Sequence, residues 1–235
     1  MKRSRINAIM READDFLRRH QFHLPPFAYW TPEDWGRRGE EVQEIAESRL
    51  GWDITDFGQE DYEHIGLFVF TLRNGVLGGP GKNYAEKILV VGVDQVTPMH
   101  FHWLKMEDII NRGGGDLAVQ IYNATPDEGL ADTPVQVSID GERRTLRAGA
   151  TVVLKPGESI ALEPRCYHKF SALGQTALIG EVSKVNDDNT DNRFYEPVGR
   201  FPAIEEDEAP LHLLVNDYGR YYRPGRGEDE KKMAT

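Results

Sequence analysis

The amino-acid sequence predicts a mainly β protein, in which an antiparallel β-barrel follows a helical N-terminal segment. From residue 65 onward, short runs of β-branched and aromatic residues are separated by turn residues, a pattern typical of sandwiches and barrels. Helical periodicity is confined to the N-terminal part, so the chain does not alternate strands with helices as a doubly wound sheet requires. Asn74-Gly75 and Asp140-Gly141 stand at the ends of strand-like runs and are typical of hairpin turns.

The N-terminal segment contains two predicted helices. Apolar residues recur at helical spacing between residues 5 and 20, with Ser4 as the expected N-cap, so this helix should cover an open barrel end or contact another subunit. Pro25-Pro26 interrupts helix formation, and Thr31-Pro32 provides an N-cap residue followed by proline at the first helical position. We expect the second helix to continue to about Leu50.

The predicted strands share β-branched and aromatic composition. They lie at residues 67–72, 88–93, 117–122, 135–139, 151–154, 159–162 and 177–182. A chain of 235 residues can form one barrel domain. We expect a single domain over residues 1–222, with helical decoration at 1–60 and the barrel core at 65–200. The polar, glycine-containing end, residues 223–235, is expected to be disordered.

The charge and cysteine content limit the partners and the compartment. The formal net charge is −11 and the pI is near 5.1, so the protein should repel nucleic acid and anionic membrane surfaces. A neutral or cationic ligand is favoured. Cys166 is the only cysteine, which rules out an intramolecular disulfide, and the N-terminus lacks the apolar core of a signal peptide. We therefore expect a cytoplasmic protein.

Four side chains form a candidate metal site. His100 and His102 flank Phe101 in a predicted strand, and strand alternation places both imidazoles on one face. Glu107 can return a carboxylate to that face if the chain bends near Lys105. His168 follows Pro164 and can add a third imidazole from a neighbouring strand. Such a nitrogen and oxygen set suits Mn, Fe, Co, Ni or Zn and leaves coordination positions open for a substrate.

This spacing resembles that of a known family. His100-x-His102-x4-Glu107-x6-Gly114 matches the metal-binding half of the first cupin motif, and Pro156-Gly157 followed by His168 resembles the second. Among cupins, the segments 100–115 and 180–194 look like bacterial D-lyxose isomerases. Two further segments, 24–27 and 50–53, extend the resemblance, which covers the chain up to about Tyr222.

The resemblance implies a cupin-type jelly-roll barrel and a reaction. Members of this family interconvert D-lyxose and D-xylulose, often accept D-mannose and D-fructose, work best with Mn²⁺, and are commonly dimeric. It therefore implies a small neutral monosaccharide as substrate, Mn²⁺ or Co²⁺ as cofactor, and a homodimer. A neutral sugar also fits the acidic character of the chain.

Isomerisation of an aldose through a cis-enediol requires an acid–base group that moves a proton between C2 and C1. We expect Lys105 to place an ammonium beside the sugar oxygens, with Lys87 as a second candidate for contact with the sugar. For the proton carrier we predict Glu206, in an acidic run after Phe201-Pro202, with Glu205 as the alternative.

The polar segment 186–193 is dense in hydrogen-bonding groups and is expected at the barrel mouth. We expect Asp187, Asp188 and Arg193 in this segment to bind sugar hydroxyls. Two other functions use the same ligands, because fold and metal site do not fix the reaction. One is an Fe-dependent cupin oxygenase, and the other is a non-catalytic sugar-binding cupin.

Overall fold

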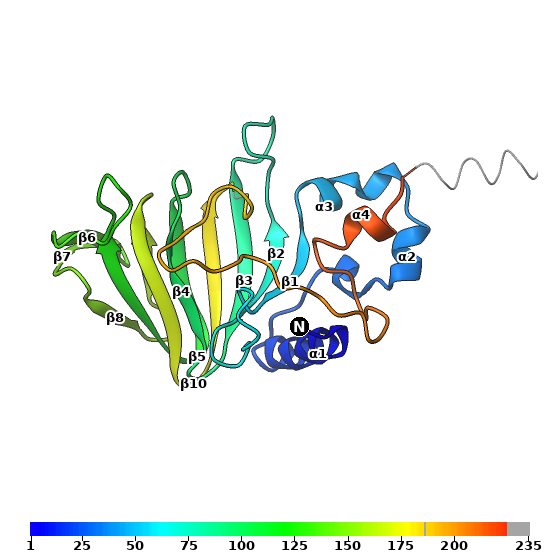
Figure 1. The fold of residues 1–235 in the computed structure, drawn as a ribbon, viewed down its shortest axis with the longest axis horizontal. Coiled ribbons are helices and arrows are strands. Elements are labelled where there is room, and N and C mark those ends of the chain that lie inside the picture. The colour runs from blue at the N-terminus through cyan, green and yellow to red at the C-terminus, as the bar shows by residue number, and fades with distance from the viewer. Residues whose placement is uncertain (186, 225–235) are drawn as a thin grey trace, which may run out of the picture.

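The computed structural model describes residues 1–185 and 187–224. Helices gather beside one end of a large antiparallel sheet system (Figure 1). Most of the tail predicted at 223–235 lies outside the described residues. The assignment of residues 1–222 to a single domain stays a prediction. No helix among the described residues is long and apolar enough to cross a membrane.

The first helix, α1 (Arg3–Arg19), confirms the expected amphipathic helix. Its apolar stripe packs on the outer face of the sheet rather than over an open barrel end, because it meets side chains of four strands and of the C-terminal segment. The shared cluster contains Ile6, Ile9, Met10, Ala13, Leu17, Trp52, Ile54, Phe68, Phe70, Ile88, Leu178 and Leu214. Ser4 is not the N-cap: Lys2 takes that position, and Ser4 N donates to Asp207 Oδ1 at 2.9 Å.

The predicted second helix begins as expected but is broken. Thr31 and Asp34 form a capping box at the start of α2 (Pro32–Gly36), which satisfies free amides of the first turn. The helix ends at Gly36, and Gly39 precedes a 3₁₀ turn, η2 (Glu40–Val42), and a short α3 (Gln43–Glu47). The prediction of one helix to Leu50 was wrong, since two glycines close together favour chain reversal over helix. A further 3₁₀ turn, η1, spans Pro26–Tyr29.

Among the described residues, eleven strands pair throughout in antiparallel fashion and confirm the predicted β-barrel. Their bounds are β1 Gly51–Thr55, β2 Leu67–Arg73, β3 Tyr84–Val91, β4 Val96–Phe101, β5 Glu107–Asn123, β6 Val135–Ile139, β7 Glu142–Leu146, β8 Thr151–Leu154, β9 Ser159–Leu162, β10 Cys166–Lys184 and β11 Arg193–Phe194. The main order is β1-β2-β3-β10-β5-β9-β6-β7, while β4 joins β10 and β11, and β8 joins β5.

Two long strands connect the two halves of this barrel. The C-terminal part of β10 pairs with β3 and its N-terminal part with β4, while β5 follows β10 along its length. Both strands bend where their register shifts, between Leu173 and Ala177. Gly114 lies at this bend with a φ of +80°, and a Cβ there would lie 2.2 Å from Thr176 O, so a side chain is excluded.

The two predicted hairpins differ in length. Asp140 and Gly141, with φ of +50° and +86°, form the tight turn between β6 and β7, as type I′ geometry requires. At Asn74-Gly75 the tight turn is absent. β2 and β3 do pair, but residues 74–83 form a longer connection.

The main core fills the space between the two halves of the barrel. It consists of apolar side chains on the inward faces of the strands, including Val69, Leu89, Val91, Ile109, Leu117, Val119, Ile121, Leu154, Ile160, Leu162, Phe170 and Ile179. Alternating residues of β3 and β10 supply this face, as strand geometry dictates. The same inward faces carry the polar side chains described below.

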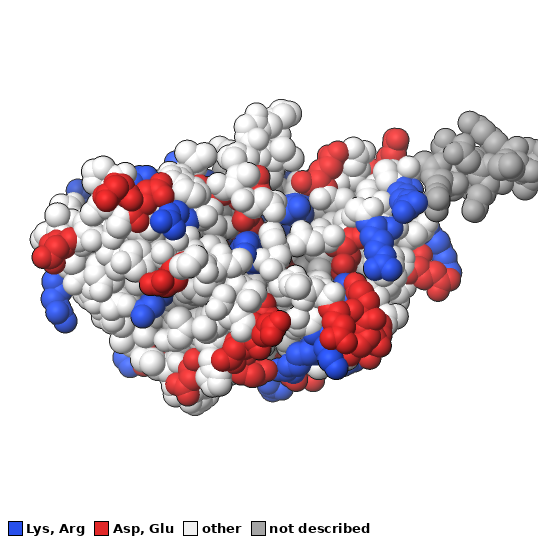
Figure 2. All heavy atoms as spheres, viewed as in Figure 1, with Lys and Arg blue, Asp and Glu red and all other residues white. Residues whose placement is uncertain are grey.

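The C-terminal segment returns across the sheet to the helices (Figure 1). It ends in α4 (Tyr218–Tyr221), which packs near α2. Arg3, fully buried, binds this segment at two places: its guanidinium contacts Glu206 at 2.8 and 2.9 Å and Asp217 at 2.9 and 3.0 Å. On the face drawn in Figure 2, acidic and basic side chains are interspersed rather than separated into one large basic patch.

Candidate active site

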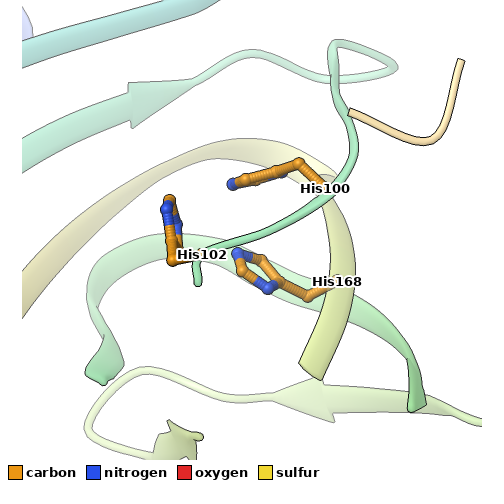
Figure 3. A group of neighbouring side chains, drawn as sticks. All are labelled: His100, His102 and His168. Carbon is orange, nitrogen blue, oxygen red and sulfur yellow. The ribbon is translucent and has the colours of Figure 1, made fainter. Parts of the chain in front are cut away.

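Three histidines converge inside the barrel. His100 lies in β4, and His102 is the first residue after the end of this strand. Phe101, between them, points to the opposite side and packs on Tyr167 with ring centroids 4.7 Å apart. His168 comes from β10, where it is the register partner of His100. The three imidazoles point toward one another (Figure 3), and one ligand nitrogen from each lies within 4.8 Å of the others. Strand alternation therefore acts as the sequence predicts.

Each imidazole is held in one tautomer by a backbone carbonyl. The Nδ1 of His100 donates to Pro98 O at 2.7 Å, that of His102 to Asp191 O at 2.6 Å, and that of His168 to Cys166 O at 3.0 Å. Because Nδ1 carries the proton, the Nε2 lone pair of each ring is free for a metal ion. Burial, followed by the neighbouring His168 and His102, holds the pKa of His100 well below its usual value.

Glu107, the first residue of β5, adds a carboxylate to this cluster. The chain bends between Phe101 and Glu107, as expected, and brings Glu107 Oε1 to 3.0 Å from His168 Nε2 and 3.5 Å from His102 Nε2. Within the described residues, this buried oxygen accepts no hydrogen bond. The Nε2 lone pairs of His102 and His168 face the unpaired Glu107 oxygen. These electron-rich atoms repel one another, and a bound cation would offset the repulsion. The donor set therefore fits a divalent metal.

A buried ion-pair network lies beside the histidines. Lys105 Nζ contacts Glu107 Oε2 at 2.5 Å and Glu181 Oε1 at 2.9 Å, and Lys87 Nζ lies 3.5 Å from the same Glu181 oxygen. Ser183 Oγ also donates to Glu181 Oε1, at 3.0 Å. All of these side chains are buried, so their charges act in a medium of low effective dielectric constant.

The network fixes the charge states of its members. Burial alone raises the pKa of Glu181, but Lys105 and Lys87 outweigh it, and the pKa of Glu181 lies below its usual value. Burial is likewise outweighed at Glu107, whose pKa lies well below the usual range because of Lys105, His102 and His168. At Lys105, the two glutamates overcome burial and raise the pKa. Both carboxylates are therefore ionised and Lys105 is charged near neutral pH.

Arg200 and Asp188 complete the wall of the cavity. Arg200 Nη2 lies 2.6 Å from Asp53 Oδ2 in β1 and 3.2 Å from Asp188 Oδ2, while Asp188 Oδ1 lies 3.7 Å from Lys87 Nζ. Arg200 Nη1 is buried and has no acceptor among the described residues. One guanidinium nitrogen thus retains unused donor capacity.

These side chains surround a cavity with about 460 Å³ of space between its atoms, its open mouth included. Its polar lining consists of Lys87, Thr97, His100, His102, Lys105, Glu107, His168, Glu181, Asp188, Asn192 and Arg200, and its apolar lining includes Phe57, Leu67, Val69, Leu89, Ile109, Phe170 and Phe194. A metal-binding donor set and a charged network therefore share one space.

The structure brings together seven of the residues predicted from sequence: His100, His102, Lys105, Glu107, His168, Lys87 and Asp188. Two others lie nearby without lining the cavity. Asp187 binds Asn189 and Thr190 inside its own loop, and Arg193 Nε donates to Glu128 Oε2 at 2.8 Å. Their expected contacts with sugar hydroxyls stay a prediction.

The structure places Glu206, the predicted proton carrier, away from the cavity. Glu206 pairs with Arg3 next to α1 and does not line the cavity. Glu205 also lies outside it, where its backbone bonds to Met1 and Arg3. Within this acidic run, Glu206 and Asp207 bind Arg3 and Ser4 of the first helix.

Sequence reasoning missed Glu181, Asn192 and Arg200. For Glu181 a signal exists: it shares a strand face with Ile179 and Ser183, and all three are buried. A charged residue at an inward position of a core strand requires a partner and is a candidate functional residue. Asn192 and Arg200 lie in irregular segments, where periodicity gives no orientation.

Comparison with known proteins identifies the relatives of this chain. Residues 1–218 match the family model described as D-lyxose isomerase. The chain is 50% identical over 227 residues to a D-lyxose/D-mannose isomerase of Serratia proteamaculans, covering 94% of this chain and 99% of the relative. It is 47% identical over 226 residues to a D-lyxose/D-mannose isomerase of Escherichia coli O157:H7, covering 94% and 100%.

Solved structures show a similar fold. The L-ribose isomerase of Acinetobacter sp. DL28, in complex with L-ribose, superposes with a TM-score of 0.59 at 16% identity, covering 87% of this chain and 98% of that one. The ligand-free L-ribose isomerase of Cellulomonas parahominis gives a TM-score of 0.55 at 17% identity, covering 83% and 95%. Given the match over most of its length, the chain belongs to the D-lyxose isomerase family.

Proposed function

We propose that this protein interconverts D-lyxose and D-xylulose, and D-mannose and D-fructose, in a metal-dependent reaction through a cis-enediol. One observation carries the proposal: a metal-binding donor set shares its cavity with Glu181, a buried carboxylate that is not part of that set. Ketol isomerisation needs both components, because the oxygens must be polarised while a separate base moves a proton. The names of the relatives support the choice of sugars.

His100, His102, Glu107 and His168 are the residues that would hold the ion, and we propose Mn²⁺, with Co²⁺ as a substitute. Three neutral imidazoles and one carboxylate, without thiolates, suit either metal. When bound, the ion supplies a Lewis acid that polarises the oxygens of the sugar and makes the adjacent C–H bond more acidic. Neighbouring protein groups supply the rest of the chemistry.

Glu181 is proposed as the proton carrier. Its carboxylate is ionised, since Lys105 and Lys87 lower its pKa, so it is ready to remove the C2 proton of an open-chain aldose. The C–H electrons form the C1–C2 double bond of the enediol, and O1 takes up the hydroxyl proton that O2 releases. The O2 electrons then form the C2 carbonyl while the C1–C2 double bond takes the proton back from Glu181 at C1, which gives the ketose.

Lys105 is proposed to stabilise the negative charge that develops on the sugar oxygens. Its ammonium is kept charged by Glu107 and Glu181, which overcome the effect of burial on its pKa. A preorganised cation in a buried cavity stabilises developing charge without the reorganisation that water needs. Lys105 also lies against both carboxylates, so it aligns the base with the metal-binding residues.

Lys87, Asp188, Asn192 and Arg200 are proposed to bind the remaining hydroxyls. They line the same cavity and offer both donors and acceptors, as a polyol requires. Arg200 Nη1 has an unused donor within the described residues. For a neutral sugar, this wall contributes orientation rather than charge attraction.

The decisive experiment is to strip the protein of metal, reload it with Mn²⁺, and assay a panel of aldoses and ketoses in D₂O. The proposal predicts turnover of D-lyxose and D-mannose with deuterium on the transferred carbon, because Glu181 can exchange its proton with solvent between the two steps. Complete retention of substrate hydrogen would favour a hydride shift and remove the proposed role of Glu181. Oxygen consumption would instead indicate an Fe-dependent oxygenase, and binding without turnover a sugar-binding protein.

We further propose that the protein is a cytoplasmic homodimer. The dimer rests on the family resemblance, and the compartment on a single cysteine in 235 residues. Light scattering after size-exclusion chromatography tests the dimer, since a monomer mass of 26.7 kDa should double.

A further inference from the structure

We propose that Asp191 is a positioning residue that fixes His102 and Lys105 relative to each other. Its backbone carbonyl orients the proposed metal ligand His102, and its carboxylate holds the backbone of Lys105. This inference rests on the proposed function, because it assumes that both residues act in the reaction. Asp191 is buried with 3% exposure and does not line the cavity, so it acts through other residues rather than on substrate.

The carboxylate of Asp191 binds the chain just before Glu107. Leu104 N donates to Asp191 Oδ1 and Lys105 N to Asp191 Oδ2, both at 3.0 Å. Two successive amides thus bind the two oxygens of one carboxylate. Hydrogen bonds to an ionised group are stronger than those between neutral groups, so they restrain the backbone from which Lys105 extends.

The backbone carbonyl of Asp191 holds the metal-binding side. It accepts a hydrogen bond from His102 Nδ1 at 2.6 Å, which sets the tautomer and the direction of the ring. A displacement of Asp191 would therefore disturb His102 and Lys105 together. The carboxylate and the carbonyl both belong to Asp191, so the placement of His102 relative to Lys105 depends on this one residue.

Within residues 1–185 and 187–224, the bend that Asp191 holds pairs with no strand. It links β4 to β5, and its other backbone hydrogen bonds are Arg165 N to His102 O at 2.8 Å and Lys184 N to Met106 O at 3.0 Å. These lie at the two ends of the bend. The Asp191 carboxylate supplies the contacts in its middle, where Lys105 is located.

Asp191 also connects the bend to the segment that faces the sugar. Asp188 precedes it by three residues and Asn192 follows it, and both line the cavity. The contacts of Asp191 therefore join the proposed hydroxyl-binding residues to the metal-binding residues. This arrangement gives Asp191 a role in catalysis without contact with the reacting atoms.

The test compares Asp191→Asn and Asp191→Glu with wild type. Asparagine keeps the size but turns one acceptor into a donor that faces a backbone amide, and glutamate keeps the charge but moves the carboxylate by one methylene. Asp140→Asn is the matched control, because Asp140 also accepts a distant backbone amide, from Ser159 at 2.9 Å, at the β6–β7 turn outside the cavity. Mn²⁺ affinity is measured on metal-free protein by the loss of the free-ion EPR signal, without sugar.

We expect both Asp191 variants to bind Mn²⁺ about 10–100-fold more weakly, the range seen when a group that orients a ligand is lost. At saturating Mn²⁺, kcat should remain at least about tenfold below wild type while KM changes less, because Lys105 stays displaced. Asp140→Asn should match wild type in both measurements. Variants with normal Mn²⁺ affinity and normal kcat, even with a lower melting temperature, would show a merely structural role.

The readouts also separate this inference from the proposed function. If wild type binds no Mn²⁺ or turns over no sugar, the proposed function fails independently of Asp191. If wild type and Asp140→Asn are active while both Asp191 variants match them, only the inference on Asp191 fails. Circular dichroism at the assay temperature establishes that each variant compared is folded.

Discussion

Lys105 Nζ lies 2.9 Å from Glu181 Oε1 in the interior of the barrel, although the two residues are 76 positions apart in sequence. Lys105 comes from the bend before β5 and Glu181 from the inward face of β10. Because both are buried, neither charge would be stable in this position alone. The pair therefore provides an ionised base and a cation beside the proposed metal ligands.

Replacing the proposed base should abolish most of the activity while preserving the metal site. We expect Glu181→Gln to lower kcat by about a hundredfold or more, the loss typical of an acid–base group, with Mn²⁺ content unchanged. Steady-state kinetics and elemental analysis provide the two measurements. Glu142→Gln, at an exposed residue that pairs with Arg144, is the control, and a normal kcat in Glu181→Gln would require another base.

Replacing Glu206 should reduce stability rather than catalysis. Glu206 binds the fully buried Arg3 but is itself partly exposed, so we expect Glu206→Gln to lower the free energy of unfolding by about 1 kcal/mol. In a protein of this size, such a loss lowers the melting temperature by about 2–4 °C. Thermal denaturation and kcat are measured together. A hundredfold loss of kcat in the folded variant would restore the sequence-based prediction that Glu206 carries the proton.

The three histidines should differ from the others in their effect on metal binding. We expect His168→Ala to lose Mn²⁺ and to lower activity by at least about a hundredfold, since it removes one of the four proposed donors, the ring nitrogen 3.0 Å from Glu107 Oε1. His100→Ala should behave in the same way. His23→Ala, at an exposed position, should change neither property, and stoichiometric metal in His168→Ala would remove His168 from the ligand set.

Chelation should remove activity but leave the barrel folded, because the apolar core between the strands does not include the histidines. Readdition of Mn²⁺ or Co²⁺ should restore activity. At a free concentration 100 times its Kd, the ion should stabilise the protein by about 2.7 kcal/mol, or roughly 5–10 °C in melting temperature. Activity that persists in a preparation without metal by elemental analysis would contradict this expectation.

The stability should depend on pH through His212. Burial lowers the pKa of His212, against a hydrogen bond to Trp30 O, whereas the unfolded chain has the ordinary value of about 6.5. As the pH falls below about 6.5, the unfolded state therefore binds a proton before the folded state does, and stability is lost until the folded pKa is reached.

Chemical denaturation of the Mn²⁺-loaded protein between about pH 7.5 and about pH 5, a range that spans the ordinary histidine pKa of about 6.5, measures this effect. We expect the free energy of unfolding of wild type to fall more steeply than that of His212→Gln. Each unit of pH in this window is worth up to about 1.4 kcal/mol for one histidine. Equal slopes in the two proteins would mean that His212 has the same pKa in both states.

The sequence by itself determined the features that depend on local patterns. Strand alternation placed His100 and His102 on one face with Phe101 on the other, and apolar spacing predicted α1 and most strands. These predictions succeed because the period of a strand or helix is a property of the backbone. The family resemblance added the cupin-type fold and the reaction class.

Only the tertiary structure decided which carboxylate joins the site. Glu181 and Glu206 have the same side chain. The register of β10 directs Glu181 into the cavity, whereas Arg3 holds Glu206 beside α1. The same holds for Asp191 and Arg200, which bind Lys105 and Asp53 at sequence separations of 86 and 147 residues. Such contacts depend on how long-range strand pairing and loop closure place irregular segments. The periodicity of a single helix or strand carries no information about contacts between residues so far apart in sequence.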